Sequence, residues 1–278
     1  MYDEPDGGYQ MWNSSSLRMR LYDVGQSAAI AWECEALAEM ASILGHTDDA
    51  AMLRERQQSL GTLIARHMWV DRLSIFSNML LNGSAFPRIS PTSFYPMLAG
   101  IASDAQATAM ITQWLTNRSR FCVPPTPDLW PPPATAVGDC YWGVPSISAD
   151  DPQYLVPGGS SGIYWRGENW SPPAYLVYLA LRRYAHLRVA REARQGLVAQ
   201  QMELLLSTWR PHHHVCENYP SSLRNTSSGG PVGRTSPQNE CTGNRFYIWG
   251  GLPALAALTE LSSNGSSLLA THGGMYRS

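Results

Sequence analysis

The chain has 278 residues, of which 44% are hydrophobic, and its formal net charge is -2. This length suits one large domain or two small ones, and the composition is that of an ordinary globular protein. All 20 basic residues are arginine and are spread along the chain, which argues against a nucleic-acid partner. The longest uncharged apolar runs, such as 175–181, are far shorter than the roughly 18 residues that cross a bilayer, so no membrane span is expected.

The cysteines and the N-terminal residues bear on the cellular compartment. No basic segment followed by an apolar run opens the chain, so no secretory leader is expected and the default is a cytoplasmic protein. Five cysteines without C-x-x-C spacing predict mostly free thiols: Cys34, Cys122, Cys140, Cys216 and Cys241. N-x-S/T triplets, such as those that begin at Asn13, Asn82, Asn117, Asn225 and Asn264, would matter only in a secreted protein.

The first half of the chain predicts helices and one small hairpin. Apolar residues recur at a helical period over about 24–44 and 48–68; Gly45 is expected to end the first helix and Thr47 to cap the second. Turn signals at 70–72 and 82–83 predict a small β-hairpin within 69–90. An uncharged helix is expected over 91–101, and a polar helix capped by Ser103 is expected to follow it.

The second half alternates long loops with helices. A connection over 119–162 is rich in proline and glycine and long enough to predict a function. A helix over 172–181 is expected next, with Ser171 as its cap and Pro172 at its first position. A charged helix over about 190–209, a loop over 210–244 and a final uncharged helix over 246–258 complete the chain.

Uncharged and charged helices alternate along the sequence. A helix that is apolar all round must be enclosed, whereas an amphipathic partner can cover it on one side. We therefore expect an all-α protein with two concentric layers, in which 91–101, 172–181 and 246–258 lie inside and 48–68 lies outside.

Two loops carry the residues suited to chemistry. Tyr164, Trp165 and Trp170 surround Arg166, and aromatic faces with a guanidinium can hold a sugar ring and its hydroxyls. The alternative is that these aromatic side chains pack the loop onto the core. Glu217 lies in the second loop, where it could activate water as a general base or be a solvated surface carboxylate. His212, His213, His214 and Cys216 precede it and suggest zinc, although their spacing matches no closed zinc pattern.

Motifs in these loops, taken together, resemble those of a known group of enzymes. Residues 164–170, 216–219 and 242–250, with the upstream segments 22–27 and 34–38, occur in the same order in inverting glycoside hydrolases with an (α/α)6 toroid. This group includes mannosylglycerate hydrolase, processing α-glucosidase and trehalase-like enzymes. The resemblance implies that residues 1–278 form a single catalytic domain, the C-terminal portion of an incomplete toroid with a small β-hairpin and long active-site loops.

The resemblance also implies roles for particular residues. It makes Glu217 the general base for hydrolysis of an α-linked glucoside or mannoside with inversion, without a cofactor or metal. The expected sugar-binding residues are Tyr164, Trp165, Arg166, Gly167, Trp170, Tyr219 and Trp249. Glu168 and Asn169 depart from the group's pattern, because many members carry proline and an aliphatic residue there.

The general acid of this group is an aspartate expected just upstream of Met1, so we expect it to be missing unless Asp3 or Asp150 supplies the proton. Two other functions stay open. One is a non-catalytic sugar-binding or scaffold protein, and the other is a zinc-dependent α/α-toroid enzyme that uses residues 212–216. Because both loops precede inner helices, the sequence predicts that the aromatic loop and Glu217 meet at one end of the helical layers.

Overall fold

A computed structural model describes residues 12–13, 15–16, 18–86, 88–122, 144–155, 164–219 and 244–264 of the chain. Its helical elements are α1 (Val24–Ile43), α2 (Thr47–His67), the 3-10 turn η1 (Pro91–Phe94), α3 (Tyr95–Leu98), α4 (Asp104–Met110), the π-helix η2 (Ile111–Leu115), α5 (Ser171–Arg183), α6 (Arg188–His212), the 3-10 turn η4 (Ile248–Gly251) and α7 (Leu252–Asn264). The strands are β1 (Trp12–Asn13), β2 (Arg18–Met19), β3 (Leu21–Tyr22), β4 (Trp69–Val70), β5 (Ile75–Phe76) and β6 (Met79–Leu80). The protein is mostly helical, as predicted.

The strands form three small antiparallel pairs, β1 with β2, β3 with β6, and β4 with β5. The pairing of β4 with β5 confirms the hairpin and the turn at 70–72. The turn at 82–83 is present too, since Gly83 has a φ of +82° and Met79 bridges Ala85 beyond it. No helix in the described part of the chain is long and apolar enough to cross a bilayer.

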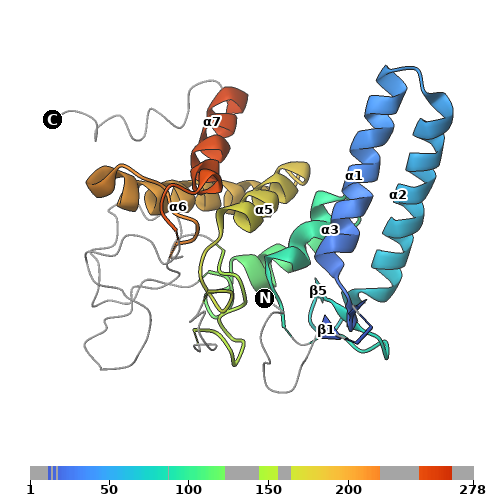
Figure 1. Cartoon of the computed structure of the whole chain (residues 1–278), viewed down its shortest axis with the longest axis horizontal. Coiled ribbons are helices and arrows are strands. Elements are labelled where there is room, and N and C mark those ends of the chain that lie inside the picture. Colours follow the sequence, from blue (N-terminus) through green and yellow to red (C-terminus); the bar gives the residue numbers. More distant parts are fainter. Residues whose placement is uncertain are drawn as a thin grey trace.

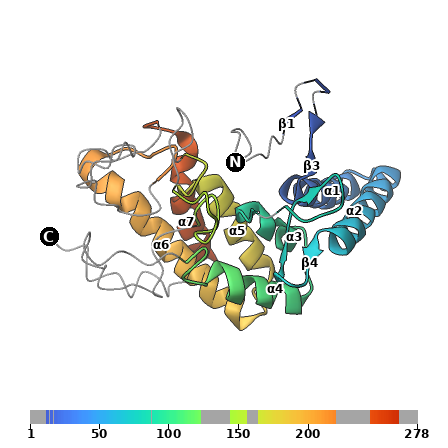
Figure 2. The same ribbon diagram turned by 90° about the horizontal axis from the view of Figure 1, so that it is seen from below.

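Figure 1 shows α1 and α2 as a long hairpin on one side of the molecule and α5, α6 and α7 on the other, with α3 between them. The turned view of Figure 2 places α5 between α3 and α6. The contacts agree, because α3 packs on α1 and α5, and α5 packs in turn on α6 and α7. Helices that are close in the sequence therefore pack against each other, from α1 and α2 through α3 and α5 to α6 and α7.

The helix ends explain much of this arrangement. Asp23 caps α1 by accepting from the backbone N–H of Gln26 at 2.7 Å, and Gly45 follows the helix with a φ of +80°. Ser103 forms a reciprocal capping box with Gln106 at the start of α4, as predicted. Thr47 does not cap α2, because the helix begins at Thr47 itself and His46 occupies the cap position without a side-chain bond.

A single core joins α1, α3, α5, α6 and η2. Val24, Ala28 and Ala31 form a buried stripe of small side chains along α1, which lets the neighbouring helices approach closely. At the far end of α5, Arg183 donates to both carboxylate oxygens of Glu35 at 2.6 and 2.7 Å and to the carbonyl of Leu98 at 3.2 Å. This guanidinium joins α1, α3 and α5 at one point.

The predicted inner and outer helices are confirmed in three of four cases. Segment 91–99 is almost wholly buried, α5 buries most of one face, and α2 buries only Ala50 and Ile64. The prediction for 246–258 is wrong. Phe246 precedes the helix with a φ of +59°, and Ile248, Leu255 and Leu258 are 90%, 46% and 63% exposed. In the described part of the chain α7 packs chiefly on α5, α6 and η4, so its opposite face is uncovered.

Candidate active site

The aromatic loop is held by its backbone. Gly167 has a φ of +132°, its N–H donates to the hydroxyl of Ser146 at 2.9 Å, and a Cβ there would lie 2.7 Å from the ring of Tyr154. Asn169 pairs with Tyr219 through two backbone hydrogen bonds of 2.8 and 2.9 Å. This bridge brings the loop before α5 alongside the segment that carries Glu217.

The start of α5 differs from the prediction. The helix begins at Ser171, Trp170 takes the extended cap position without a side-chain bond, and Pro172 is the second helical residue. Ser171 is therefore not the cap. Its hydroxyl is buried and has no hydrogen-bond partner among the described residues.

The aromatic residues form one cluster. Trp165 stacks on Trp170 with ring centroids 3.8 Å apart and planes 10° apart, and Tyr164 meets both edge-on at 5.5 and 4.5 Å. Trp249 approaches Trp170 at 6.3 Å, and Tyr247 lies 4.3 Å from Trp249. Trp170 is only 2% exposed, so it supports Trp165 from behind, whereas Trp165 and Trp249 are partly exposed.

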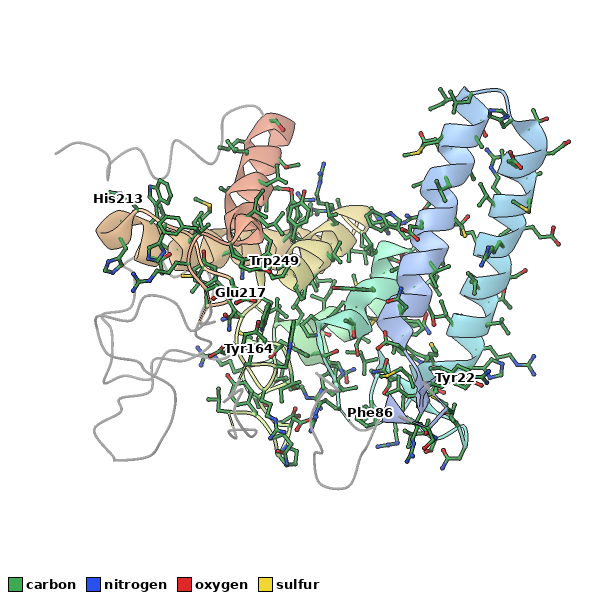
Figure 3. All side chains as sticks on the ribbon, in the orientation of Figure 1. Tyr22, Phe86, Tyr164, His213, Glu217 and Trp249 are labelled. Carbon is green, nitrogen blue, oxygen red and sulfur yellow. The ribbon has the colours of Figure 1, made fainter. Side chains whose placement is uncertain are left out.

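Glu217 lies against this cluster and is 7% exposed. Its Oε1 accepts from the hydroxyl of Tyr164 at 2.6 Å, and its Oε2 accepts from the backbone N–H and the side-chain amide of Asn244 at 3.0 and 2.8 Å. The indole N–H of Trp249 donates to the Glu217 carbonyl at 2.8 Å. Figure 3 shows Tyr164, Glu217 and Trp249 gathered on the loops beneath α6 and α7.

Burial and the hydrogen bond to Glu217 raise the pKa of Tyr164 well above its ordinary value of about 10. The phenol therefore keeps its proton throughout the range in which an enzyme works. It remains a donor, and its bond fixes the direction of the carboxylate.

A second carboxylate is buried nearby. Glu168 is 3% exposed and accepts a hydrogen bond from the side-chain amide of Asn218, the residue after Glu217. Its charge contributes to the raised pKa of Tyr164. The sequence marked Glu168 as a departure from the group's pattern but gave it no role.

The predicted sugar-binding residues divide by exposure. Tyr164, Trp165, Arg166 and Trp249 are partly exposed, whereas Gly167, Trp170 and Tyr219 are buried. Tyr219 is inaccessible and donates its hydroxyl to the carbonyl of Gly250 at 3.1 Å. Arg166 donates to the side chain of Gln153 at 3.0 Å, and this hydrogen bond helps to hold its guanidinium in place. The buried three shape the site, and the exposed four can touch a ligand.

Asn244 is the residue that the sequence prediction missed. It lies inside the segment 242–250 that supported the resemblance, directly after Gly243, but the motif gave it no role. The only available signal was its place in that segment, since a partner 27 residues from Glu217 cannot be read from spacing.

The histidine run does not form a metal site in the described residues. His213 ends α6 with a φ of +54°, and His214 is buried against Phe246 with ring centroids 5.4 Å apart. Cys216 is disulfide-bonded and has no thiolate to offer. The described part of the chain contains no group of three or more His, Cys, Asp or Glu residues placed to hold an ion.

The prediction of mostly free thiols is wrong for two of the three described cysteines. Cys122 and Cys216 are both disulfide-bonded, and Cys34 is a buried free thiol. Cys140 and Cys241 lie outside the described residues. Spacing alone could not reveal these disulfides, because a disulfide requires two thiols to meet in space.

The model of the mannosylglycerate hydrolase MGH1-like glycoside hydrolase domain matches residues 4–219. The chain belongs to this family of glycoside hydrolases. That membership confirms the resemblance inferred from the loop motifs. No curated protein matches the chain by sequence.

Solved structures of MGH1-like and related glycosidases share the fold. Mannosylglycerate hydrolase from Thermus thermophilus, in complex with glucose, superposes with a TM-score of 0.57 at 17% identity, covering 86% of this chain and 48% of that one. Neutral trehalase from Saccharomyces cerevisiae superposes with a TM-score of 0.59 at 15% identity, covering 87% of this chain and 38% of that one. The chain thus has the helical fold of the (α/α)6 glycosidases and spans about half the length of these relatives or less.

Proposed function

We propose that this MGH1-like chain belongs to an inverting glycosidase that cleaves an α-linked glucoside or mannoside, with Glu217 as the general base. One observation carries the proposal: Glu217 is buried beside partly exposed tryptophans and is oriented by three hydrogen bonds. The structures of relatives that hold glucose, or Tris and D-glycerate, agree with a small hydroxylated substrate.

The hydrogen bonds leave Glu217 able to take a proton. A carboxylate has about four lone-pair sites on its two oxygens. Asn244 engages Oε2 twice, whereas Tyr164 alone engages Oε1 among the described residues. Oε1 is therefore the atom we assign to accept the proton of the attacking water.

The sugar would lie on the exposed aromatic faces, with its C–H groups against Trp165 and Trp249. Water held by Oε1 attacks the anomeric carbon from the face opposite the leaving oxygen, so an α-glycoside gives a β-sugar. A second carboxyl group, roughly 6.5–9.5 Å from the first in inverting enzymes, protonates the leaving oxygen.

Glu217 is the only residue to which we assign a catalytic role. Asp3 lies outside the described residues. Asp150 accepts from Ser148 at 2.6 Å and from Arg120 at 3.2 Å, so both of its carboxylate oxygens are engaged away from the Glu217 cluster.

The test is hydrolysis of a panel of α-glucosides and α-mannosides, including mannosylglycerate and trehalose, with the product's anomeric form followed by NMR. From mannosylglycerate and simple α-glycosides the proposal expects β-anomer as the first sugar product, from trehalose equal amounts of α- and β-glucose, and no product from the Glu217→Gln variant. First release of α-anomer alone would exclude inversion, and sugar binding without turnover by any panel member would favour the non-catalytic binding function.

A further inference from the structure

The disulfides indicate an oxidising environment. Cys122, after η2, and Cys216, after α6, each take part in a disulfide. Disulfides persist in the secretory pathway and outside the cell and are rare in the cytosol. The expected cytoplasmic location took no account of disulfides, and the disulfides argue against it.

Two N-x-S triplets adopt the same local geometry. Asn82 Oδ1 accepts from the backbone N–H of Ser84 at 3.0 Å and from its hydroxyl at 2.7 Å. Asn117 Oδ1 accepts from the backbone N–H of Ser119 at 2.9 Å and from its hydroxyl at 2.8 Å. These are Asx turns in which the serine hydroxyl also reaches the asparagine amide. A proton donated to Oδ1 draws electron density from the amide and eases loss of a proton from Nδ2.

Both triplets lie where a large group can be attached. Residues 81–84 are exposed at the tip of a turn closed by a 2.8 Å hydrogen bond from Leu80 N–H to the Ser84 carbonyl. Leu81 at this tip is 61% exposed, and a neighbouring oligosaccharide would shield its apolar surface. Asn117 is half-buried after η2, and Arg118 and Ser119 beside it are exposed.

Asn13 provides a comparison. Its Oδ1 accepts from the backbone N–H groups of Ser15 and Ser16 at 3.0 and 3.1 Å. No serine hydroxyl bond to Asn13 is found among the described residues. Asn169 begins a further triplet with Ser171 but is only 1% exposed. Asn225 and the residues after Asn264 lie outside the described ranges. Among the described triplets, Asn82 and Asn117 are therefore the two that combine an exposed turn with the hydroxyl contact.

We propose that Asn82 and Asn117 are N-glycosylation sites, used as the chain enters an oxidising secretory compartment. The donor is an oligosaccharide carried on a polyprenyl diphosphate, and a membrane transferase catalyses the step. A bond forms between Nδ2 and the anomeric carbon, the bond from that carbon to the diphosphate oxygen breaks, the diphosphate leaves with the electron pair, and Nδ2 loses one proton. This inference does not rest on the proposed glycosidase function.

The experiment directs the full 278-residue chain into the secretory pathway of a eukaryotic cell with a cleavable leader. Glycans are then removed by peptide N-glycosidase in heavy-oxygen water, which leaves labelled aspartate at each occupied site, and the peptides are mapped by mass spectrometry. We expect label at Asn82 and Asn117. Both the medium and the cell-retained fraction are analysed. The oligosaccharide is transferred as the chain enters the secretory pathway, so a variant that folds poorly and stays in the cell still shows whether its asparagines are occupied.

Matched variants separate the two sites. Ser84→Ala should abolish label at Asn82 and leave Asn117 occupied, Ser119→Ala should do the reverse, and Ser84→Thr should retain label because it keeps the hydroxyl. Absence of label at either asparagine in both fractions overturns the proposal for that site, and label at Asn82 that persists in Ser84→Ala contradicts the hydroxyl's role. Finding Cys122 and Cys216 as free thiols in the same product would contradict the argument from oxidation.

Discussion

The hydroxyl of Tyr164 donates a 2.6 Å hydrogen bond to Oε1 of Glu217, although 53 residues separate them in the chain. The bond joins the loop before α5 to the segment after α6. It also places the proposed base against the aromatic cluster and adds to the backbone bridge between Asn169 and Tyr219.

Replacing that phenol should lower turnover. Tyr164→Phe keeps the ring and removes the donor, and a hydrogen bond to a charged group is worth about 1.5–3 kcal/mol. We therefore expect a fall in kcat of roughly 10- to 100-fold, with KM changed much less. Steady-state kinetics measures both constants, and a variant that raises KM alone would mean that Tyr164 binds sugar without orienting Glu217.

Trp165 should govern sugar binding. It is the partly exposed member of the stacked pair with Trp170, so Trp165→Ala removes the face on which a sugar can lie. An aromatic contact is worth about 0.5–1.5 kcal/mol beyond its buried area, which corresponds to roughly 2- to 13-fold weaker binding. Titration calorimetry measures the sugar affinity of Trp165→Ala and of its parent, both carrying Glu217→Gln so that the sugar is not hydrolysed.

Trp209→Ala is the matched control for that experiment, because Trp209 is a 47% exposed indole on α6 that pairs with His213 away from the cluster. Its affinity for sugar should equal that of the parent. Equal loss in both variants would show that tryptophan removal acts through stability, not through the proposed binding face.

The motifs and the local helix signals could be predicted from sequence, and the partners that orient Glu217 could not. Glu217 and Trp165 lie in short stretches whose residue types suggest chemistry by themselves. Asn244 could not be predicted as a partner of Glu217, because their contact depends on the path of a long loop. For the same reason, the burial of Tyr219 and Trp170 could not be predicted, because it depends on two loops that pair through Asn169.

The remaining differences between the predictions and the structure depend on which segments pack against each other. The apolar composition of 246–258 predicted an enclosed helix, but burial depends on what packs on each face, and α5 and α6 cover α7 on one side only. The cysteines illustrate the same point. A disulfide requires two thiols to meet in space, and neither the number of cysteines nor their spacing in the sequence reveals which thiols do so.

Loss of the Cys216 disulfide should destabilise the site. Cys216 is fully buried directly before Glu217, and removing a native disulfide typically costs about 2–4 kcal/mol. We expect Cys216→Ser to unfold at lower denaturant concentration and to lose activity. Cys34→Ser, which alters a buried free thiol on α1, should leave activity unchanged. Reductant should reproduce the Cys216→Ser effect in the parent, and resistance of the parent to reductant would contradict this prediction.

Tyr178 makes stability sensitive to alkaline pH. Burial and its 2.9 Å hydrogen bond to Glu260 raise the pKa of Tyr178 to about 12, from an ordinary value of about 10. The folded state thus favours the protonated phenol, and this contribution is complete below about pH 10 and is lost as pH rises towards about 12. Denaturant unfolding over that range should show a steeper loss of stability in the parent than in Tyr178→Phe. Identical slopes would exclude the Tyr178 contribution.

The central claim is that Glu217 activates water, and α-glucosyl and α-mannosyl fluoride test it most directly. Fluoride leaves as an anion and needs little protonation, so hydrolysis of these substrates depends on the base and hardly on a general acid. A positioned base contributes about 10²- to 10⁴-fold, so Glu217→Gln should hydrolyse the preferred fluoride slower by that factor while binding sugar as tightly as the parent. Hydrolysis of the fluoride by Glu217→Gln at the parent's rate would contradict the assignment of Glu217 as the base.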